Sequence, residues 1–179
     1  MNSSQRVVKN SIYGVIGEGV GGVLQFLIII FIARTLGTEG FGIFSYVLAF
    51  VGVFQLIADF GLTNMIVREI VRDKSKANTI ISSLRPLIAI LAVTVFLLIT
   101  SSIHLFTSDP VVYKSTYVMA AAVMITFQAM VYASVCRAFE EMGYNAVGFV
   151  SHKIALLVFV GVALEGNYGI LGIAVAYFL

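Results

Sequence analysis

The feature that most constrains this chain is a series of apolar segments, each about as long as a bilayer is thick. A helix needs about 20 apolar residues to cross a hydrocarbon core of ~30 Å. Five segments meet this length and a sixth begins near the last residue, at about residues 12–33, 42–62, 86–106, 115–136, 146–164 and 169–179. The sequence therefore predicts an all-α polytopic membrane protein with about six transmembrane helices, the sixth truncated, and we expect a fragment of a longer protein.

Composition supports this class and excludes others. The chain has 179 residues, of which 60% are hydrophobic and 11% are charged, whereas soluble domains have roughly 45–50% and about 25%. A globule of this size has too little interior for so many apolar side chains. These values exclude an ordinary soluble enzyme, a disordered tail and a nucleic-acid-binding domain. The single cysteine, Cys136, has no partner for an internal disulfide.

The sequence offers no catalytic or metal-binding signature. The patterns H-E-x-x-H, G-x-x-x-x-G-K-[ST] and G-x-S-x-G are absent. His104 and His152 fall in loops on opposite sides of the predicted membrane, so they cannot share a metal ion. We therefore expect no enzyme activity, no catalytic residue, no metal and no cofactor, with coupling to H⁺ or Na⁺ as an open possibility.

The lysines and arginines indicate the orientation of the chain. If the N-terminus is cytoplasmic, nine of the eleven basic residues lie inside: Arg6, Lys9, Arg68, Arg72, Lys74, Lys76, Arg85, Arg137 and Lys153. Arg34 and Lys114 lie outside. Because cytoplasmic loops carry an excess of Lys and Arg, this distribution predicts a multi-pass protein with its N-terminus in the cytoplasm.

Two polar residues interrupt the first apolar segment. Glu18 and Gln25 are seven residues apart and share one helix face, and an ionisable group inside a span is costly unless it is paired or hydrated. Glu18 either reaches water at the cytoplasmic interface or lines a polar cavity, where it would bind a proton or another cation. Gly17 and Gly21 form a G-x-x-x-G pair, which lets another backbone approach closely.

Three further polar residues are candidates for the same cavity. Gln128 lies in the middle of the fourth segment and either joins two helices by a hydrogen bond or contacts a sugar. Lys153 lies one to two turns into the fifth segment and either snorkels to the cytoplasmic interface or faces an anionic headgroup. Arg137 and Lys153 are the expected cytoplasmic phosphate contacts. The substrate-cavity candidates are thus Glu18, Gln25, Gln128, Arg137 and Lys153.

A polar interval, residues 68–85, follows the second segment. Asp59, just before it, either marks the end of a helix or pairs with Arg68 or Arg137. Residues 66–73 have the composition of a short interfacial helix. The interval as a whole reads as a solvated cytoplasmic connector held by anionic headgroups.

Two stretches carry a family resemblance. Residues 33–45 read ARTLGTEGFGIFS and residues 59–70 read DFGLTNMIVREI. They resemble the patterns A-R-x-L-G-x-x-x-F-G and D-x-G-L-x-x-x-x-x-R-E of polysaccharide biosynthesis proteins, which are lipid-linked oligosaccharide flippases of the multidrug/oligosaccharidyl-lipid/polysaccharide exporter superfamily. We read the matching residues as mainly architectural, with glycines such as Gly40 permitting a tight turn: Arg34, Gly37, Phe41, Gly42, Asp59, Gly61, Arg68 and Glu69.

The resemblance implies a fold of about twelve to fourteen spans in two pseudo-symmetric lobes. This chain would be most of the first lobe, and its partner would be the missing C-terminal lobe. The family is thought to bind a polyprenyl-pyrophosphate-linked glycan in a cationic cavity and to open alternately to each membrane face. Glu18 departs from this pattern because an acid does not suit a pyrophosphate, which favours cation coupling or a missing basic partner.

These observations lead to one hypothesis and two alternatives. The hypothesis is a plasma-membrane flippase that moves a lipid-linked oligosaccharide outward for surface polysaccharide (O-antigen, capsule or exopolysaccharide) biosynthesis. Its partners would be the lipid-linked oligosaccharide and membrane lipids, and we expect it to bind no nucleic acid. The alternatives are a cation-coupled multidrug exporter of the same superfamily and a non-transporting scaffold of a glycan-synthesis complex.

Overall fold

The predicted all-α class is confirmed. The computed structural model describes residues 3–166 and 168–178, and this part of the chain contains helices and no strand. The elements are α1 (Ser3–Asp59), α2 (Leu62–Arg72), the 3₁₀ helix η1 (Lys74–Lys76), α3 (Ala77–Phe106), α4 (Pro110–Ala138), α5 (Met142–Glu165) and α6 (Gly169–Phe178). Within that part, four helical stretches are long and apolar enough to cross a membrane, and the longest, Ile12–Arg72, includes a kink.

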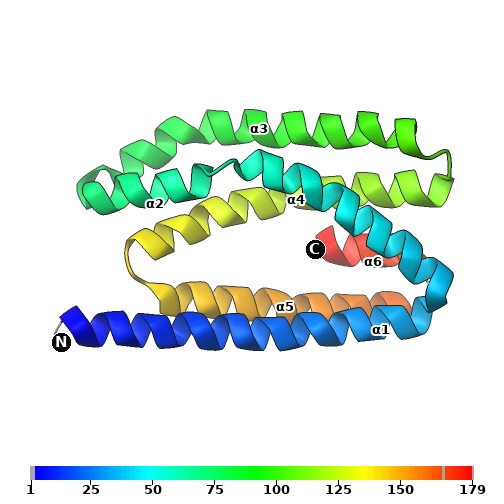
Figure 1. Cartoon of the computed structure of the whole chain (residues 1–179), viewed down its shortest axis with the longest axis horizontal. Helices are drawn as coiled ribbons and strands as arrows, with labels where there is room; N and C mark the ends of the chain where they lie inside the picture. Colours follow the sequence, from blue (N-terminus) through cyan, green and yellow to red (C-terminus); the bar gives the residue numbers. More distant parts are fainter. Residues whose placement is uncertain (1–2, 167, 179) are drawn as a thin grey trace.

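The kink divides α1 into two helices at Gly37. Gly37 has φ 68° and ψ −172°, a conformation that is essentially restricted to glycine. Beyond it the chain turns back, and the second half of α1 runs diagonally across the bundle (Figure 1). The predicted segments 12–33 and 42–62 lie on either side of this glycine. The turn makes no comparable demand at Gly42, which has no positive φ and open space where a Cβ would lie.

A second break separates α1 from α2. Phe60 and Gly61 both have positive φ, 33° and 83°, and the carboxylate of Asp59 accepts hydrogen bonds from the Thr63 N–H (3.3 Å) and the Thr63 hydroxyl (3.2 Å). Of the two roles considered for Asp59, the structure therefore favours the helix end. No ion pair joins Asp59 to an arginine in the described part of the chain.

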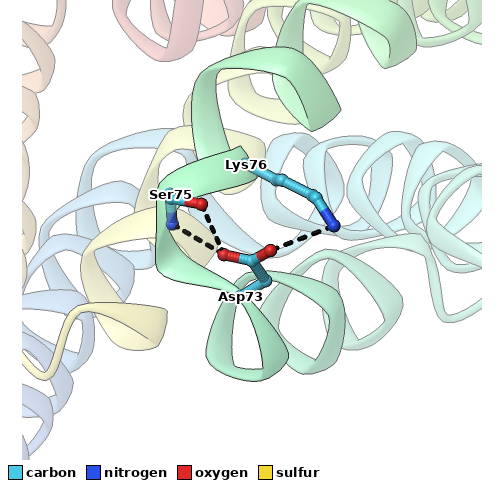
Figure 2. A network of polar contacts seen from close by, with 3 residues as sticks. All are labelled: Asp73, Ser75 and Lys76. Atoms are coloured by element: carbon cyan, nitrogen blue, oxygen red, sulfur yellow. Dashed lines mark hydrogen bonds and ion pairs between the residues drawn. The ribbon is translucent and has the colours of Figure 1, made fainter.

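The connection from α2 to α3 is a compact polar turn. Asp73 accepts hydrogen bonds from the Ser75 N–H (3.1 Å) and the Ser75 hydroxyl (2.6 Å) and forms an ion pair with Lys76 at 3.0 Å (Figure 2). The Ser75 hydroxyl hydrogen bond and the contact with Lys76 lower the pKa of the Asp73 carboxyl below 3.8. This exposed turn ends α2 and starts η1.

Apart from the diagonal second half of α1, the long helices run roughly along one common direction (Figure 1). In Figure 1, α1 and α5 run along the lower edge, α3 and α4 along the upper edge, and α6 between them. The N-terminus, α2 and the α4–α5 connection lie at one end, and the α3–α4 connection and the α1 kink lie at the other. The largest fully buried side chains are aliphatic apart from one aromatic ring and one threonine: Ile28, Ile32, Val47, Ile66, Ile70, Ile88, Ile99, Ile103, Thr116, Phe127, Val160 and Ile173.

Candidate functional site

A polar cluster joins three helices in the interior of this bundle. The Lys153 ammonium of α5 donates a hydrogen bond to the Gln25 side-chain oxygen of α1, with Nζ and Oε1 2.7 Å apart. The Gln25 side-chain nitrogen in turn donates to the Tyr177 hydroxyl of α6 at 3.3 Å. All three side chains are partly buried. We call Gln25, Lys153 and Tyr177 the polar triad.

Small residues on α1 bring the first two members together. A Cβ built on Gly17 would lie 2.7 Å from the Ala146 Cβ, and one built on Gly21 would overlap the Phe149 ring. One turn further along each helix, Gln25 meets Lys153. The rising residue numbers on both helices show that α5 runs parallel to the first half of α1. The predicted close approach of another backbone is confirmed at Gly17, whereas Gly21 meets a side-chain ring.

Lys153 lies near the middle of helix α5. Helix α5 begins at Met142 rather than near residue 146, so Lys153 is the twelfth of its 24 residues. It lies about 17 Å along the helix from the first residue, at 1.5 Å per residue. This position is near the middle of helix α5.

The partners of the Lys153 ammonium are neutral. Besides Gln25, the ammonium faces the Phe149 ring, with Nζ 5.6 Å from the ring centroid. Across the described residues the single ion pair is Lys76 with Asp73, far along the sequence from this helix. The Lys153 ammonium thus forms no ion pair with a carboxylate among residues 3–166 and 168–178.

The other cavity candidates do not join the polar triad. Glu18 is exposed and makes no hydrogen bond or ion pair with the described residues. Gln128 is partly buried in α4 and likewise has no hydrogen-bond partner there. Arg137 lies in the last turn of α4, and its Nε is buried without an acceptor. The structure therefore pairs two of the five candidates, Gln25 and Lys153, and leaves three apart.

Three of the eight motif residues lie at the helix breaks. Gly37 forms the kink, Gly61 and Asp59 form the α1–α2 junction, and Arg34 and Arg68 are exposed. The Glu69 carbonyl accepts the Asp73 N–H, and the Phe41 ring lies 6.4 Å from the Phe44 ring, whose centroid is 5.9 Å from Tyr177.

Tyr177 is the member of the site that the sequence analysis missed. Its neighbours in α6 are small or apolar, so the segment reads as a plain hydrophobic span. The Tyr177 hydroxyl could have indicated a polar contact, because a phenol inside a membrane segment usually needs a hydrogen-bond partner. No group of three or more His, Cys, Asp or Glu side chains capable of holding a metal occurs within the described ranges.

Comparisons with known proteins agree with the motif-based resemblance. The family model described as polysaccharide biosynthesis protein matches residues 7–179. The chain is 38% identical over 64 residues to a Shigella flexneri protein named "Putative O-antigen transporter", a match that covers 36% of this chain and 15% of that relative. The chain thus matches a small part of the length of that relative. No solved structure matches the chain.

Proposed function

The chain belongs to the polysaccharide biosynthesis protein family, and from this membership we propose that it forms part of a flippase for a polyprenyl-pyrophosphate-linked oligosaccharide. The protein would act by alternating access in the plasma membrane, with its N-terminus in the cytoplasm, and would serve surface polysaccharide assembly. It would perform no covalent chemistry. The name of the Shigella flexneri relative, an O-antigen transporter, supports a role in export.

The observation that carries the proposal is the unbalanced charge of Lys153. A charged side chain inside the membrane is costly and marks a ligand or ion pathway in most proteins. The Lys153 ammonium has an amide oxygen at 2.7 Å and an aromatic ring, but no anion, among its described neighbours. A pyrophosphate would supply that anion through charge-assisted hydrogen bonds. A cavity for cationic drugs would instead require an acid at this depth.

The remaining candidates have supporting roles in this proposal. The Arg137 Nε–H is buried without an acceptor at the end of α4, so it is suited to donate a hydrogen bond to a phosphate oxygen. The Gln128 amide forms no hydrogen bond with a described residue, so it is available to bind a sugar hydroxyl. The exposed carboxylate of Glu18 is the candidate for H⁺ or Na⁺ coupling.

The proposal is tested by neutralising Lys153 in the full-length transporter. We expect Lys153→Ala to weaken binding of undecaprenyl pyrophosphate by about 10- to 100-fold, because a hydrogen bond to a charged group contributes ~1.5–3 kcal/mol. Lys153→Arg should stay within a few-fold of the parent protein. Binding would be measured by native mass spectrometry, and transport by complementation of a strain lacking the flippase.

The matched control is Lys74→Ala. Lys74 lies in the exposed turn η1, outside the bundle interior, and contacts the Phe139 ring. Its replacement should leave binding unchanged. If Lys153→Ala binds the pyrophosphate as tightly as the parent protein, or if Lys74→Ala weakens binding equally, the proposed site is wrong.

A further inference from the structure

We infer that Gln25 determines the charge specificity of the polar triad: by holding Lys153 with a neutral oxygen, it keeps the ammonium charge available to an anionic ligand. This inference rests on the proposed function and adds a specificity-determining residue to it. It concerns Gln25, which would not itself need to touch the ligand. Tyr177 is the positioning residue that holds the amide in place.

The orientation of the Gln25 amide follows from the chemistry of its neighbours. A lysine ammonium can only donate hydrogen bonds, so the amide must present its oxygen to Lys153, at 2.7 Å. The amide nitrogen then points to the Tyr177 hydroxyl, which accepts its hydrogen bond at 3.3 Å. The two contacts use opposite ends of one amide, and together they fix its rotation. A free amide would rotate, and half of its orientations would place N–H groups against the ammonium.

The neutrality of residue 25 matters because its side-chain oxygen lies within ion-pair distance of the Lys153 ammonium. A glutamate at this position would place a carboxylate oxygen where the amide oxygen now lies, since the two side chains have nearly the same shape. The ammonium would then have a permanent counter-ion in a low-dielectric setting, where opposite charges attract strongly. A phosphate would have to compete with this carboxylate and would also be repelled by it. Glutamine keeps the lysine in place without cancelling its charge.

Among the described residues, no carboxylate forms a hydrogen bond or an ion pair with a member of the triad. The Phe149 ring faces the ammonium with its π-electrons, 5.6 Å away, and adds no formal charge. The nearest acid along α1, Glu18, is seven residues away and forms no ion pair with described residues. His152 precedes Lys153 in α5, but its side chain is exposed. The net charge at the triad is therefore decided by the choice between Gln and Glu at position 25.

The test compares Gln25→Glu with Gln25→Leu in the full-length protein. The charge mechanism predicts that Gln25→Glu weakens undecaprenyl pyrophosphate binding at least 10-fold, while Gln25→Leu, which leaves the lysine charge uncancelled, weakens it less than 5-fold. The melting temperature should follow the reverse order, with Gln25→Glu equal to or above the parent protein and Gln25→Leu below it. A purely structural role would make Gln25→Leu the more damaging change in both measurements.

A neutral probe separates charge from fold. Undecaprenol has the same lipid chain without the pyrophosphate, and its binding should be the same in both variants and in the parent protein. Tyr177→Phe, which removes the hydroxyl acceptor, should weaken pyrophosphate binding about 2- to 5-fold and leave undecaprenol binding unchanged. Loss of undecaprenol binding in Gln25→Glu would overturn the charge mechanism, because it would show a change in the site as a whole.

The outcomes distinguish the inference from the proposed function. If Lys153→Ala loses pyrophosphate binding while Gln25→Glu retains it within 2-fold, the inference is overturned and the anion site stands. If Lys153→Ala retains binding, the anion site itself is wrong, whatever Gln25→Glu does. If both variants lose pyrophosphate binding and keep that of undecaprenol, both proposals are supported.

Discussion

At the scale of single residues, Asp73 shows how one carboxylate ends a helix and begins the next. Its contacts with Ser75 and Lys76 lie in the exposed turn between α2 and α3 (Figure 2). We expect Asp73→Ala to remove both contacts and raise the hydrogen-exchange rate of the residue 74–77 amides. Asp73→Asn keeps an acceptor for the Ser75 N–H and loses the ion pair, so its exchange rates should be intermediate.

Asp109 provides the control for this experiment. Its carboxylate accepts a hydrogen bond from the Val111 N–H at 2.8 Å and caps α4 at the opposite end of the bundle. Asp109→Ala should raise amide exchange at the start of α4 and leave residues 74–77 unchanged. Unaltered exchange at residues 74–77 in Asp73→Ala would show that the carboxylate does not hold the turn.

The same residue gives a pH prediction with a definite sign. The pKa of the Asp73 carboxyl is lowered below 3.8, first by the Ser75 hydroxyl hydrogen bond and then by Lys76. A lowered folded-state pKa means that the contacts contribute stability above pH 3.8 and are lost as the pH falls through the lower folded value. The Ser75 amide NMR signal should therefore titrate with a midpoint below 3.8. A midpoint at or above 3.8 would contradict the arrangement.

At the scale of helices, the contact between α1 and α5 depends on a missing side chain. A Cβ on Gly17 would lie 2.7 Å from the Ala146 Cβ and 3.1 Å from its Cα, so one helix would have to shift. Overpacking of this kind typically costs ~1–3 kcal/mol. We expect Gly17→Ala to lower the free energy of unfolding by about that amount in detergent-based unfolding experiments.

Gly19 is the matched control on the same helix. A Cβ on Gly19 meets nothing within 4 Å, and alanine is favoured over glycine in a helix by up to ~1 kcal/mol. Gly19→Ala should therefore leave stability unchanged or raise it. Equal destabilisation by both substitutions would mean that helix α5 does not pack closely against Gly17.

The sequence predicted the helices better than it predicted their partners. Runs of apolar residues were enough to predict the helical class, and the G-x-x-x-G pair at Gly17 and Gly21 indicated that a backbone comes close. Neither signal identifies the helix that packs against these glycines or the direction in which that helix runs. The spacing of small residues describes only one of the two helices in a contact. The pairing of Gln25 with Lys153 depends on that missing information.

The start of helix α5 could not be predicted from hydropathy for a related reason. Hydropathy marks where apolar side chains begin, near residue 146, but a helix is held by backbone hydrogen bonds that polar residues also make. Helix α5 therefore begins at Met142, and Lys153 is the twelfth of its 24 residues. Tyr177 was missed because its segment is otherwise uniformly apolar or small.

At the scale of the whole molecule, the parallel packing of α1 and α5 constrains the path of the chain. If α1 crossed the membrane once, α3, α4 and α5 would be the second, third and fourth crossings, and α5 would run antiparallel to α1. Because α5 runs parallel to the first half of α1, the chain must cross once more between these two helices. The turn at Gly37 allows the second half of α1 to make that crossing. Odd-numbered crossings then share one direction, as the distribution of basic residues also requires.

This reasoning gives a prediction for the two ends of α3. Without Lys153, which lies near the middle of α5, eight basic residues remain on the proposed cytoplasmic side against two outside, and this distribution still predicts a cytoplasmic N-terminus. In a Cys136→Ser background, which removes the single native thiol, a membrane-impermeant maleimide should label Ser108→Cys in intact cells. Asn78→Cys should be labelled only after the membrane is opened. Both positions are exposed and lie near opposite ends of α3. The reverse labelling pattern would invert the topology and place the Arg137 end of α4 outside the cell.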